Sequence, residues 1–270
     1  MVTLVPRNRN LRCADASMTE YCVDDVVDFL DTFLRIPEIP DDSRALNGLQ
    51  VANSGRLLRL AAAVDACQAT IDAAVTCGAG LLIVHHGLFW GGLKPLTGPQ
   101  GRRVRALIRG DLALYAAHIP LDCHPDVGNN AILARELGLR DPQPFGNYEG
   151  TKIGVTGELQ ASRAGLADSL QRLLGAVPRV LATGPEQVRR VAVVTGAGSD
   201  HIREAHDAGA DTLITGEGPH HSYFDAEECG VNVIFGGHYA TETVGVKALA
   251  SHLSQRFGVP WEFLDHPTGL

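Results

Sequence analysis

The sequence predicts an α/β protein made of two similar lobes with mixed sheets, joined as one compact unit. Short apolar runs alternate with segments of helical periodicity along most of the 270 residues, and strands that alternate with helices form parallel or mixed sheets. An internal repeat supports the two lobes, because residues 71–87 align without a gap on residues 202–218. In both segments a helical pattern, a Gly-Ala turn and an apolar strand follow one another.

The elements of the first lobe can be placed from the period of their apolar residues. A helix is expected from Val23, because Val26, Val27, Leu30 and Leu34 recur at helical spacing. Strands are expected at residues 47–51, 58–64, 81–86 and 112–118, with helices near residues 69–77, 102–109 and 130–137.

The second lobe repeats this alternation. A loose, polar stretch at residues 140–150 separates the lobes, which we place at residues 18–145 and 146–270. Residues 1–17 are polar and aperiodic, so we expect a disordered extension there, with Met18 as the true start of the protein. The expected strands of the second lobe lie at residues 152–159, 190–196, 211–217 and 231–238, with helices near residues 164–174, 201–208 and 241–257.

Composition and charge exclude several classes of protein. With 45% hydrophobic and 20% charged residues the chain is an ordinary globular one, and no apolar run reaches transmembrane length. The net charge is −8 at pH 7 without a concentrated basic patch, which argues against a nucleic-acid-binding surface. The six cysteines form no C-x-x-C pair and no disulfide-dense pattern, as expected for a cytoplasmic protein with reduced thiols.

Side chains that can bind metals stand where three of the apolar runs end. In α/β sheets, ligands collect at the carboxyl ends of strands, because the loops and helix N-termini that follow leave backbone groups free. The six residues form three pairs: His85 and His86, His118 and Asp122, and His238 and Glu242. The last two pairs share a His-x-x-x-carboxylate spacing at matching positions of the repeat.

The types of these side chains predict a metal centre. Neighbouring side chains of a strand point to opposite faces, so His85 and His86 need a turn to reach one site, and Gly87 permits one. Imidazole and carboxylate groups without a thiolate suit Zn²⁺, Mn²⁺, Fe²⁺ or Ni²⁺ rather than Ca²⁺. The donors exceed what one tetrahedral site uses, and carboxylates can bridge. They therefore predict two divalent metal ions per chain, about 3.5–4 Å apart, between the lobes.

Five motifs carry a resemblance to a known family. The segments NGLQV, VHHGLFWGG, HIPLDCHPDVGNNA, TGEGPHH and GGHYATETVGVKAL resemble, in order and spacing, those of the GTP cyclohydrolase 1 type 2 homologues, also called Nif-three-like dinuclear-metal proteins. The similarity runs from about Asp24 to Asp265 and fits the short bacterial form. One departure is Tyr239, which follows His238 where related sequences often have a second histidine.

The resemblance implies a ligand set and an assembly. It assigns the metal ligands to His85, His86, Asp122, His238 and Glu242. It also implies a homohexamer, which nothing in the composition or periodicity indicates by itself.

Four further residues are candidates for the same site. His118 is the counterpart of His238 in the repeat, so it is either a sixth ligand or a residue that orients Asp122, and we favour the second role. Glu217 takes the place of His86 in the second lobe and is a candidate general base or substrate contact. His220 and His221 follow it and are candidates to line the same cleft. For these last three residues the alternative is a solvated loop position.

Two classes of function fit these residues. The first is a metal-dependent hydrolase, in which two cations lower the pKa of a bridging water, and the resemblance implies attack on a nucleotide such as GTP. The sequence has no P-loop and no G-x-G-x-x-G after a strand, so phosphates would bind the metals or arginines such as Arg102 and Arg103. The second is a non-enzymatic metal-binding, protein-interaction or regulatory role. A third, DNA binding by a ring-shaped oligomer, is weakened by the acidic charge.

Overall fold

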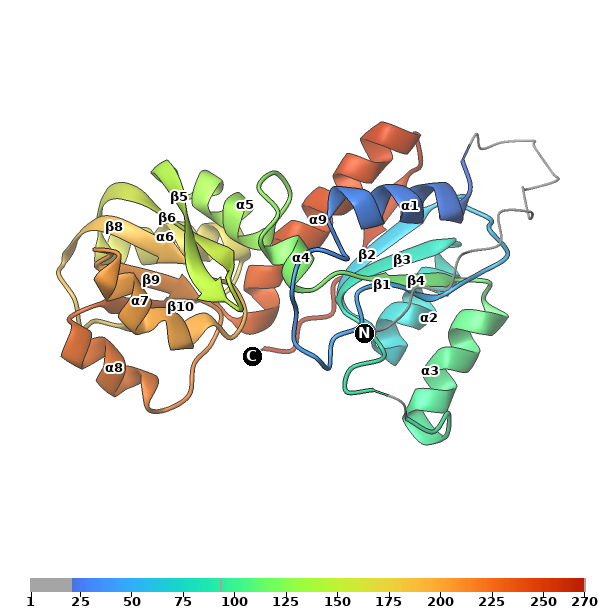
Figure 1. The fold of residues 1–270 in the computed structure, drawn as a ribbon, viewed down its shortest axis with the longest axis horizontal. Coiled ribbons are helices and arrows are strands. Elements are labelled where there is room, and N and C mark those ends of the chain that lie inside the picture. Colours follow the sequence, from blue (N-terminus) through green and yellow to red (C-terminus); the bar gives the residue numbers. More distant parts are fainter. Residues whose placement is uncertain (1–20, 93, 270) are drawn as a thin grey trace.

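The computed structural model describes residues 21–92 and 94–269, which form two sheets with helices on both faces of each (Figure 1). The two sheets lie side by side along the longest axis of the molecule. The α/β fold with two similar lobes and mixed sheets is confirmed. The expected extension at residues 1–17 and the expected start at Met18 lie outside the described residues.

The first sheet has five strands in the order β1-β4-β3-β2-β11. Its strands β2, β3, β4 and β11 are parallel, and β1 runs antiparallel to β4 at the edge. The central strands read as unbroken apolar runs because helices bury both faces of a parallel sheet. The bounds are β1 Gly48–Val51, β2 Leu60–Asp65, β3 Leu81–His86, β4 Ala113–Ala116 and β11 Trp261–Phe263.

Alternate side chains of the first sheet enter two different cores. One core lies against helices α1 and α9, and the other lies against α2 and α3. In strand β3, for example, Ile83 belongs to the first core and Val84 to the second, as the two-residue period of a strand requires. The helices are α1 Val23–Phe33, α2 Gln68–Thr76, α3 Gly98–Arg109 and α9 His238–Phe257.

The second sheet has six strands in the order β5-β6-β8-β9-β10-β7. Strands β8, β9 and β10 are parallel, and the remaining three pair in an antiparallel manner. Helices α5 and α6 cover one face, and α7 and α8 cover the other. The bounds are β5 Arg140–Tyr148, β6 Thr151–Ser162, β7 Arg179–Leu181, β8 Gln187–Val193, β9 Thr212–Thr215, β10 Asn232–Phe235, α5 Asn129–Glu136, α6 Arg163–Leu174, α7 Ile202–Asp207 and α8 Ser222–Cys229.

The internal repeat is a repeat of topology. The order β1-β4-β3-β2 of the first sheet corresponds to β7-β10-β9-β8 of the second. In each of these sets of four strands, three are parallel, and the fourth, β1 or β7, pairs antiparallel at one end. The short helix α4 Ile119–Asp122 after β4 therefore corresponds to the long helix α9 after β10.

Helix α9 connects the two lobes. It begins at the carboxyl edge of the second sheet and packs with its buried Val246, Leu249 and Leu253 on the first sheet (Figure 1). Each such side chain contributes about 1.5–3 kcal/mol through burial. Strand β11 then joins the first sheet next to β2. The expected boundary between the lobes at residue 145 therefore does not coincide with the boundary between the sheets. Strand β5, which begins before residue 145, already belongs to the second sheet, and the chain returns to the first sheet after residue 238.

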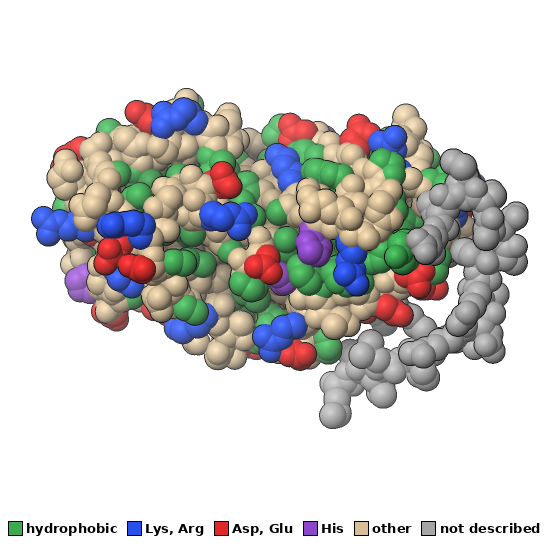
Figure 2. Space-filling model, turned by 90° about the horizontal axis from the view of Figure 1, so that it is seen from above, with side chains coloured by type: hydrophobic (Ala, Val, Ile, Leu, Met, Phe, Trp, Pro, Cys, Tyr) green, Lys and Arg blue, Asp and Glu red, His purple; other side chains and the backbone are tan. Residues whose placement is uncertain are grey.

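The surface carries charges of both signs. On the face shown in Figure 2, lysine and arginine side chains are scattered among aspartates and glutamates, and no continuous basic patch forms there. Among the described residues, no helix combines the length and the apolar character that crossing a membrane requires.

Candidate metal centre

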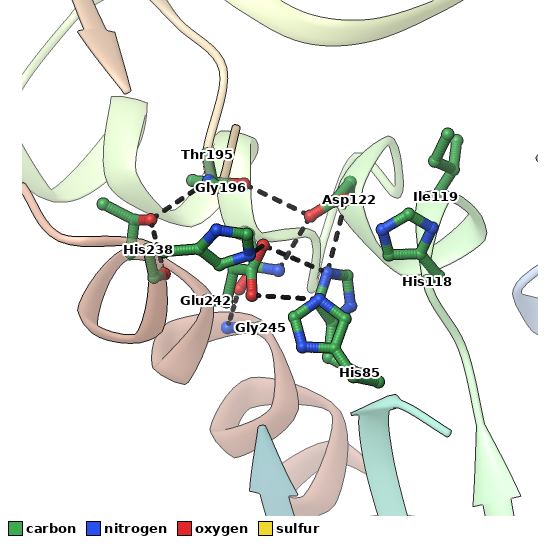
Figure 3. A network of polar contacts seen from close by, with 12 residues as sticks. His85, His118, Ile119, Asp122, Thr195, Gly196, His238, Glu242 and Gly245 are labelled. Atoms are coloured by element: carbon green, nitrogen blue, oxygen red, sulfur yellow. Dashed lines mark hydrogen bonds and ion pairs between the residues drawn. The ribbon is translucent and has the colours of Figure 1, made fainter. Parts of the chain in front are cut away.

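The six histidines and carboxylates expected at the strand ends come close together, and Figure 3 labels all of them except His86. His85 and His86 end β3, His118 precedes α4, and Asp122 ends that helix. His238 is the first residue of α9, and Glu242 lies one turn later. Both lobes therefore contribute side chains to one cluster.

Glu242 lies at the middle of the cluster. Its carboxylate Oε1 is 3.5 Å from His85 Nε2 and 3.2 Å from His238 Nε2, and its Oε2 is 3.4 Å from His86 Nε2. Asp122 Oδ2 lies 3.5 Å from His85 Nε2 on the other side. His85 and Glu242 are both almost completely buried.

The orientation of each imidazole is fixed from its far side. His85 Nδ1 donates to the carbonyl of Ala117 at 2.9 Å, and the other three histidines donate to carboxylates. The pairs are His86 with Asp65 at 2.9 Å, His118 with Asp41 at 2.7 Å and His238 with Glu217 at 2.7 Å. Since these oxygens can only accept, each Nδ1 carries the proton, and in the neutral ring Nε2 keeps a lone pair for the centre. This is the usual arrangement of metal-binding histidines.

Two buried atoms of the cluster have no hydrogen-bond partner, His85 Nε2 and Glu242 Oε2. Leaving such groups unpaired costs free energy, so a buried orphan calls for an explanation such as an ion. Two groups of residues bring their ligand atoms within 4.8 Å of one another: His85, His86 and His118, and His86, His238 and Glu242. The residues thus fit a metal ion bound by nitrogen and oxygen.

The electrostatics of the cluster favour a cation. Burial lowers the pKa of His85, but Asp122 and Glu242 outweigh it and raise that pKa to about 10. A hydrogen bond to Glu242 raises the pKa of His238 to about 9. Despite burial, the surrounding histidines hold the pKa of Glu242 well below its usual range. The carboxylates therefore create a negative potential that a divalent cation can neutralise.

Asp122 is held by a network that joins three parts of the fold. Its Oδ1 accepts hydrogen bonds from Asn129 Nδ2 at 2.8 Å and from Thr195 Oγ1 at 3.2 Å. Asn129 Oδ1 in turn accepts from the backbone N–H of Gly245 in α9 at 2.7 Å. The other oxygen, Oδ2, is left to face the centre (Figure 3).

Two glycines allow close approaches around the centre. Gly196, in the loop after β8, has φ +64, and a Cβ there would collide with Glu242 Oε1. Gly87 does not adopt a positive φ, contrary to a role as a left-handed turn residue. Instead a Cβ on Gly87 would displace the side chain of Gln50, whose Oε1 accepts from the N–H of Leu88 at 2.7 Å.

His118 behaves like the other three histidines of the cluster. Its side chain bonds to Asp41, and within the described residues no side-chain hydrogen bond joins it to Asp122. His118 is thus oriented by Asp41, as the other histidines are by their own partners. Trp90 stands edge-on to it, with ring centroids 5.0 Å apart, and covers this side of the cluster.

The remaining candidates lie outside the cluster. Glu217 orients His238 and is half exposed. His221 lines a cavity next to Glu217, and His220 packs edge-on against Phe224 at 5.6 Å. Tyr239, at the departure from the family pattern, donates a hydrogen bond to Asp265 at 2.8 Å and accepts one from the N–H of His266 at 2.7 Å.

The sequence did not reveal the residues that orient the candidate ligands. Asp65 ends a strand at the same sheet edge as the histidines, so the rule that found them could have found it. Asp41, Asn129 and Thr195 lie in loops or at a helix start, where the local sequence gives no comparable signal.

Comparison with known proteins decides the family. A family model described as Duf34/NIF3 (NGG1p interacting factor 3) matches residues 21–268. The chain belongs to this family. The GTP cyclohydrolase 1 type 2 homolog of Deinococcus radiodurans is 52% identical over 250 residues, 92% of this chain and 94% of that protein. The homolog of the same name from Halobacterium salinarum is 48% identical and covers 92% of this chain and 99% of its own.

Solved structures of other proteins share this fold. The crystal structure of TTHA1606 from Thermus thermophilus has a TM-score of 0.86 at 44% identity, covering 92% of this chain and 100% of that one. Reduced HcgD from Methanocaldococcus jannaschii has a TM-score of 0.80 at 27% identity, covering 91% and 98%. The resemblance to the GTP cyclohydrolase 1 type 2 homologues is thus confirmed.

Proposed function

We propose that this NIF3-family protein is a metal-dependent hydrolase that holds two divalent metal ions per chain and acts on a nucleotide-like substrate. The observation that carries the proposal is the common orientation of four imidazoles, each fixed through Nδ1, around a buried carboxylate with an unpartnered oxygen. The nucleotide is suggested by the name of the curated relatives, GTP cyclohydrolase 1 type 2 homolog.

The donor atoms support two ions rather than one. The two groups that could hold a metal share His86 but otherwise differ, and each contains donors that the other lacks. Carboxylate oxygens of both Asp122 and Glu242 lie 3.5 Å from His85 Nε2. We assign the ligands to His85, His86, His118, Asp122, His238 and Glu242, with Zn²⁺, Mn²⁺, Fe²⁺ or Ni²⁺ as ions that suit this set.

The proposed reaction needs an activated water and a group that accepts its proton. Divalent ions bound there would bring the pKa of a coordinated water near neutrality. Glu217 is the group we assign to proton transfer, because Oε1 is fixed by His238 while the side chain stays half exposed beside the cavity. A carboxylate in that position can accept a proton from water or substrate.

The test combines metal content with turnover. Full-length protein purified without chelator should contain close to two metals per chain by elemental analysis, and should convert GTP into ring-opened or otherwise hydrolysed products seen by chromatography. At saturating metal concentration Glu217→Gln should still hold the metals, because its amide oxygen can accept the hydrogen bond from His238 Nδ1, and it should lose most turnover. Glu228→Gln, at an exposed position of α8, should behave as wild type. Protein with two metals and no turnover of any nucleotide tested would refute the hydrolase.

A second candidate is a non-enzymatic metal-binding or protein-interaction role. The family description, NGG1p interacting factor 3, refers to a protein partner and supports it. It predicts bound metal with unchanged affinity for a protein partner after Glu217→Gln.

We also propose a homohexamer and a cytoplasmic location. The hexamer rests on the family resemblance, and multi-angle light scattering should give six times the chain mass of 28.7 kDa. The cytoplasm is supported by the cysteines, since all five in the described part of the chain are free.

A further inference from the structure

The first turn of helix α9 carries two of the proposed ligands, His238 and Glu242, but its start has no side-chain cap. The N-cap residue is Gly237, with φ 92, which offers no side chain to the free N–H groups of the turn. A capping side chain typically adds about 1 kcal/mol to the stability of a helix. The position of this turn therefore depends on the contacts that it makes with the rest of the fold.

Tyr239, the second residue of α9, makes such a contact. The residue is 7% exposed and belongs to the core of the first lobe. Its hydroxyl is used in both directions, because it donates to Asp265 Oδ1 at 2.8 Å and accepts from the N–H of His266 at 2.7 Å. The segment after β11 is thereby bound to the helix start, near the junction of the two lobes (Figure 1).

The same segment is also fixed to a strand that ends beside the metal centre. Leu264 is buried, and its N–H donates to the carbonyl of Ala62 in β2 at 2.8 Å. Strand β2 ends at Asp65, whose Oδ1 accepts from His86 Nδ1 at 2.9 Å. Residues 264–266 therefore connect the first turn of α9 with the strand end that orients His86.

We propose that Tyr239 is a positioning residue, which binds the first turn of α9 to the segment after β11 and so sets the distance between His238 and His86. The ring centroids of these two histidines lie 5.4 Å apart. Together with Glu242 they form one of the two groups that could hold a metal. This inference rests on the proposed metal centre and adds a residue, outside the ligand set, on which one of its two ions depends.

The other group that could hold a metal does not depend on this connection. His85 and His86 end β3 and His118 precedes α4, so α9 contributes no donor to this group. A displaced helix start would change the geometry of one group and leave the other in place. Loss of a residue that orients a metal ligand lowers metal affinity about 10–100-fold. Because Tyr239 acts through the helix, we expect the lower end of this range, about tenfold, for one ion only.

The experiment is isothermal titration calorimetry of the metal-free protein with Zn²⁺, which follows the binding of both ions. Tyr239→Phe keeps the ring in the core and removes only the hydroxyl, so one ion should bind about tenfold more weakly and the other as in wild type. The matched control is Tyr115→Phe, because Tyr115 also donates to a carboxylate at 2.8 Å, that of Asp31 in α1. The control should bind both ions as wild type does, and the two metal-free variants should have similar melting temperatures.

Two variants of Asp265 separate the hydrogen bond from the charge. Asp265→Ala removes the acceptor of the Tyr239 hydroxyl and should weaken the same ion by a similar factor. Asp265→Asn removes the negative charge but keeps an oxygen that can accept the hydrogen bond. It should therefore bind both ions as wild type does.

The outcomes distinguish this inference from the proposed function. If wild-type protein binds fewer than two ions, the proposed centre is wrong and the inference fails with it. If wild type binds two ions, the inference alone is overturned when Tyr239→Phe keeps both affinities or weakens both ions equally. It is also overturned when Tyr115→Phe weakens binding as much as Tyr239→Phe does, or Asp265→Asn as much as Asp265→Ala.

Discussion

Replacing Asp41 by asparagine tests whether His118 is held for metal binding. Asp41 Oδ1 accepts from His118 Nδ1 at 2.7 Å, while Oδ2 accepts from Asn47 Nδ2 at 2.7 Å and from the N–H of Ile119 at 3.0 Å. An asparagine can satisfy only one of these sides. If its oxygen faces His118, its NH₂ group faces two other donors, and the reverse orientation places donor against donor at His118.

The expected loss follows from these contacts. A hydrogen bond to a charged group contributes about 1.5–3 kcal/mol and a neutral one about 0.5–1.5 kcal/mol. The free energy of unfolding should therefore fall by about 1–2 kcal/mol in the variant. Loss of a carboxylate that orients a ligating histidine lowers metal affinity about 10–100-fold. Both effects should appear in Asp41→Asn.

The assay is a competition titration of the metal-free protein with a chelator of known affinity, followed by elemental analysis. The matched control is Asp42→Asn, whose carboxylate pairs with Arg44 on the surface and should leave metal affinity unchanged. If Asp41→Asn binds both metals as tightly as Asp42→Asn does, His118 is not held as a ligand and the assignment is wrong.

Three further predictions concern the cluster and the second lobe. Glu242→Gln removes the central negative charge, so elemental analysis should show the loss of at least one metal, while circular dichroism should show a folded protein. The control is Glu262→Gln, at an exposed glutamate of β11. Full metal content in Glu242→Gln would contradict the site. Because both lobes supply the proposed ligands, removal of the metals with EDTA should lower the melting temperature. Metal added at about 100 times its dissociation constant should raise the free energy of unfolding by about 2.7 kcal/mol. An unchanged melting temperature would show that metal does not join the lobes. Lys152, Asn147 and His201 hold the pKa of Glu204 at about 2 against the effect of burial, so its contribution to stability exists above the unfolded pKa near 4.5 and is lost as the pH falls toward 2. Glu204→Gln should thus be less stable than wild type at pH 7, by about 1 kcal/mol for this partly exposed group, and a gap that does not close between pH 4.5 and 2 would argue against the shift.

The sequence predicts those parts of the fold whose pattern is local. The helix from Val23 and the strand at residues 81–86 agree with α1 and β3, because their apolar periods reflect burial on one side or on both. At β5 the sequence predicts a loose connection instead of a strand, since RDPQPFGNY is polar and contains prolines. It is an exposed edge strand, where prolines are tolerated. Strands β7 and β11 have three residues each, too few for a period.

In the candidate site, too, some residues can be predicted from the sequence and others cannot. The candidate ligands at strand ends could be found because the end of an apolar run marks the sheet edge. The residues that orient them depend on contacts between distant segments: Asp41 and His118 are 77 positions apart, and Asn129 and Gly245 are 116 positions apart. No spacing rule joins such pairs, so they become visible only when the chain is folded.

The length and anchorage of α9 have a mechanical consequence. The helix of 20 residues carries His238 and Glu242 at one end, and its buried Val246, Leu249 and Leu253 lie in the core of the first lobe. It therefore acts as a rigid strut that fixes the angle between the lobes. Because His238 and Glu242 lie on this helix, they stay beside His85 and His86, and a hinge motion between the sheets would separate them from the loops of the second lobe. We expect small molecules to enter and leave by rearrangement of the loops after the strands, with the two sheets stationary.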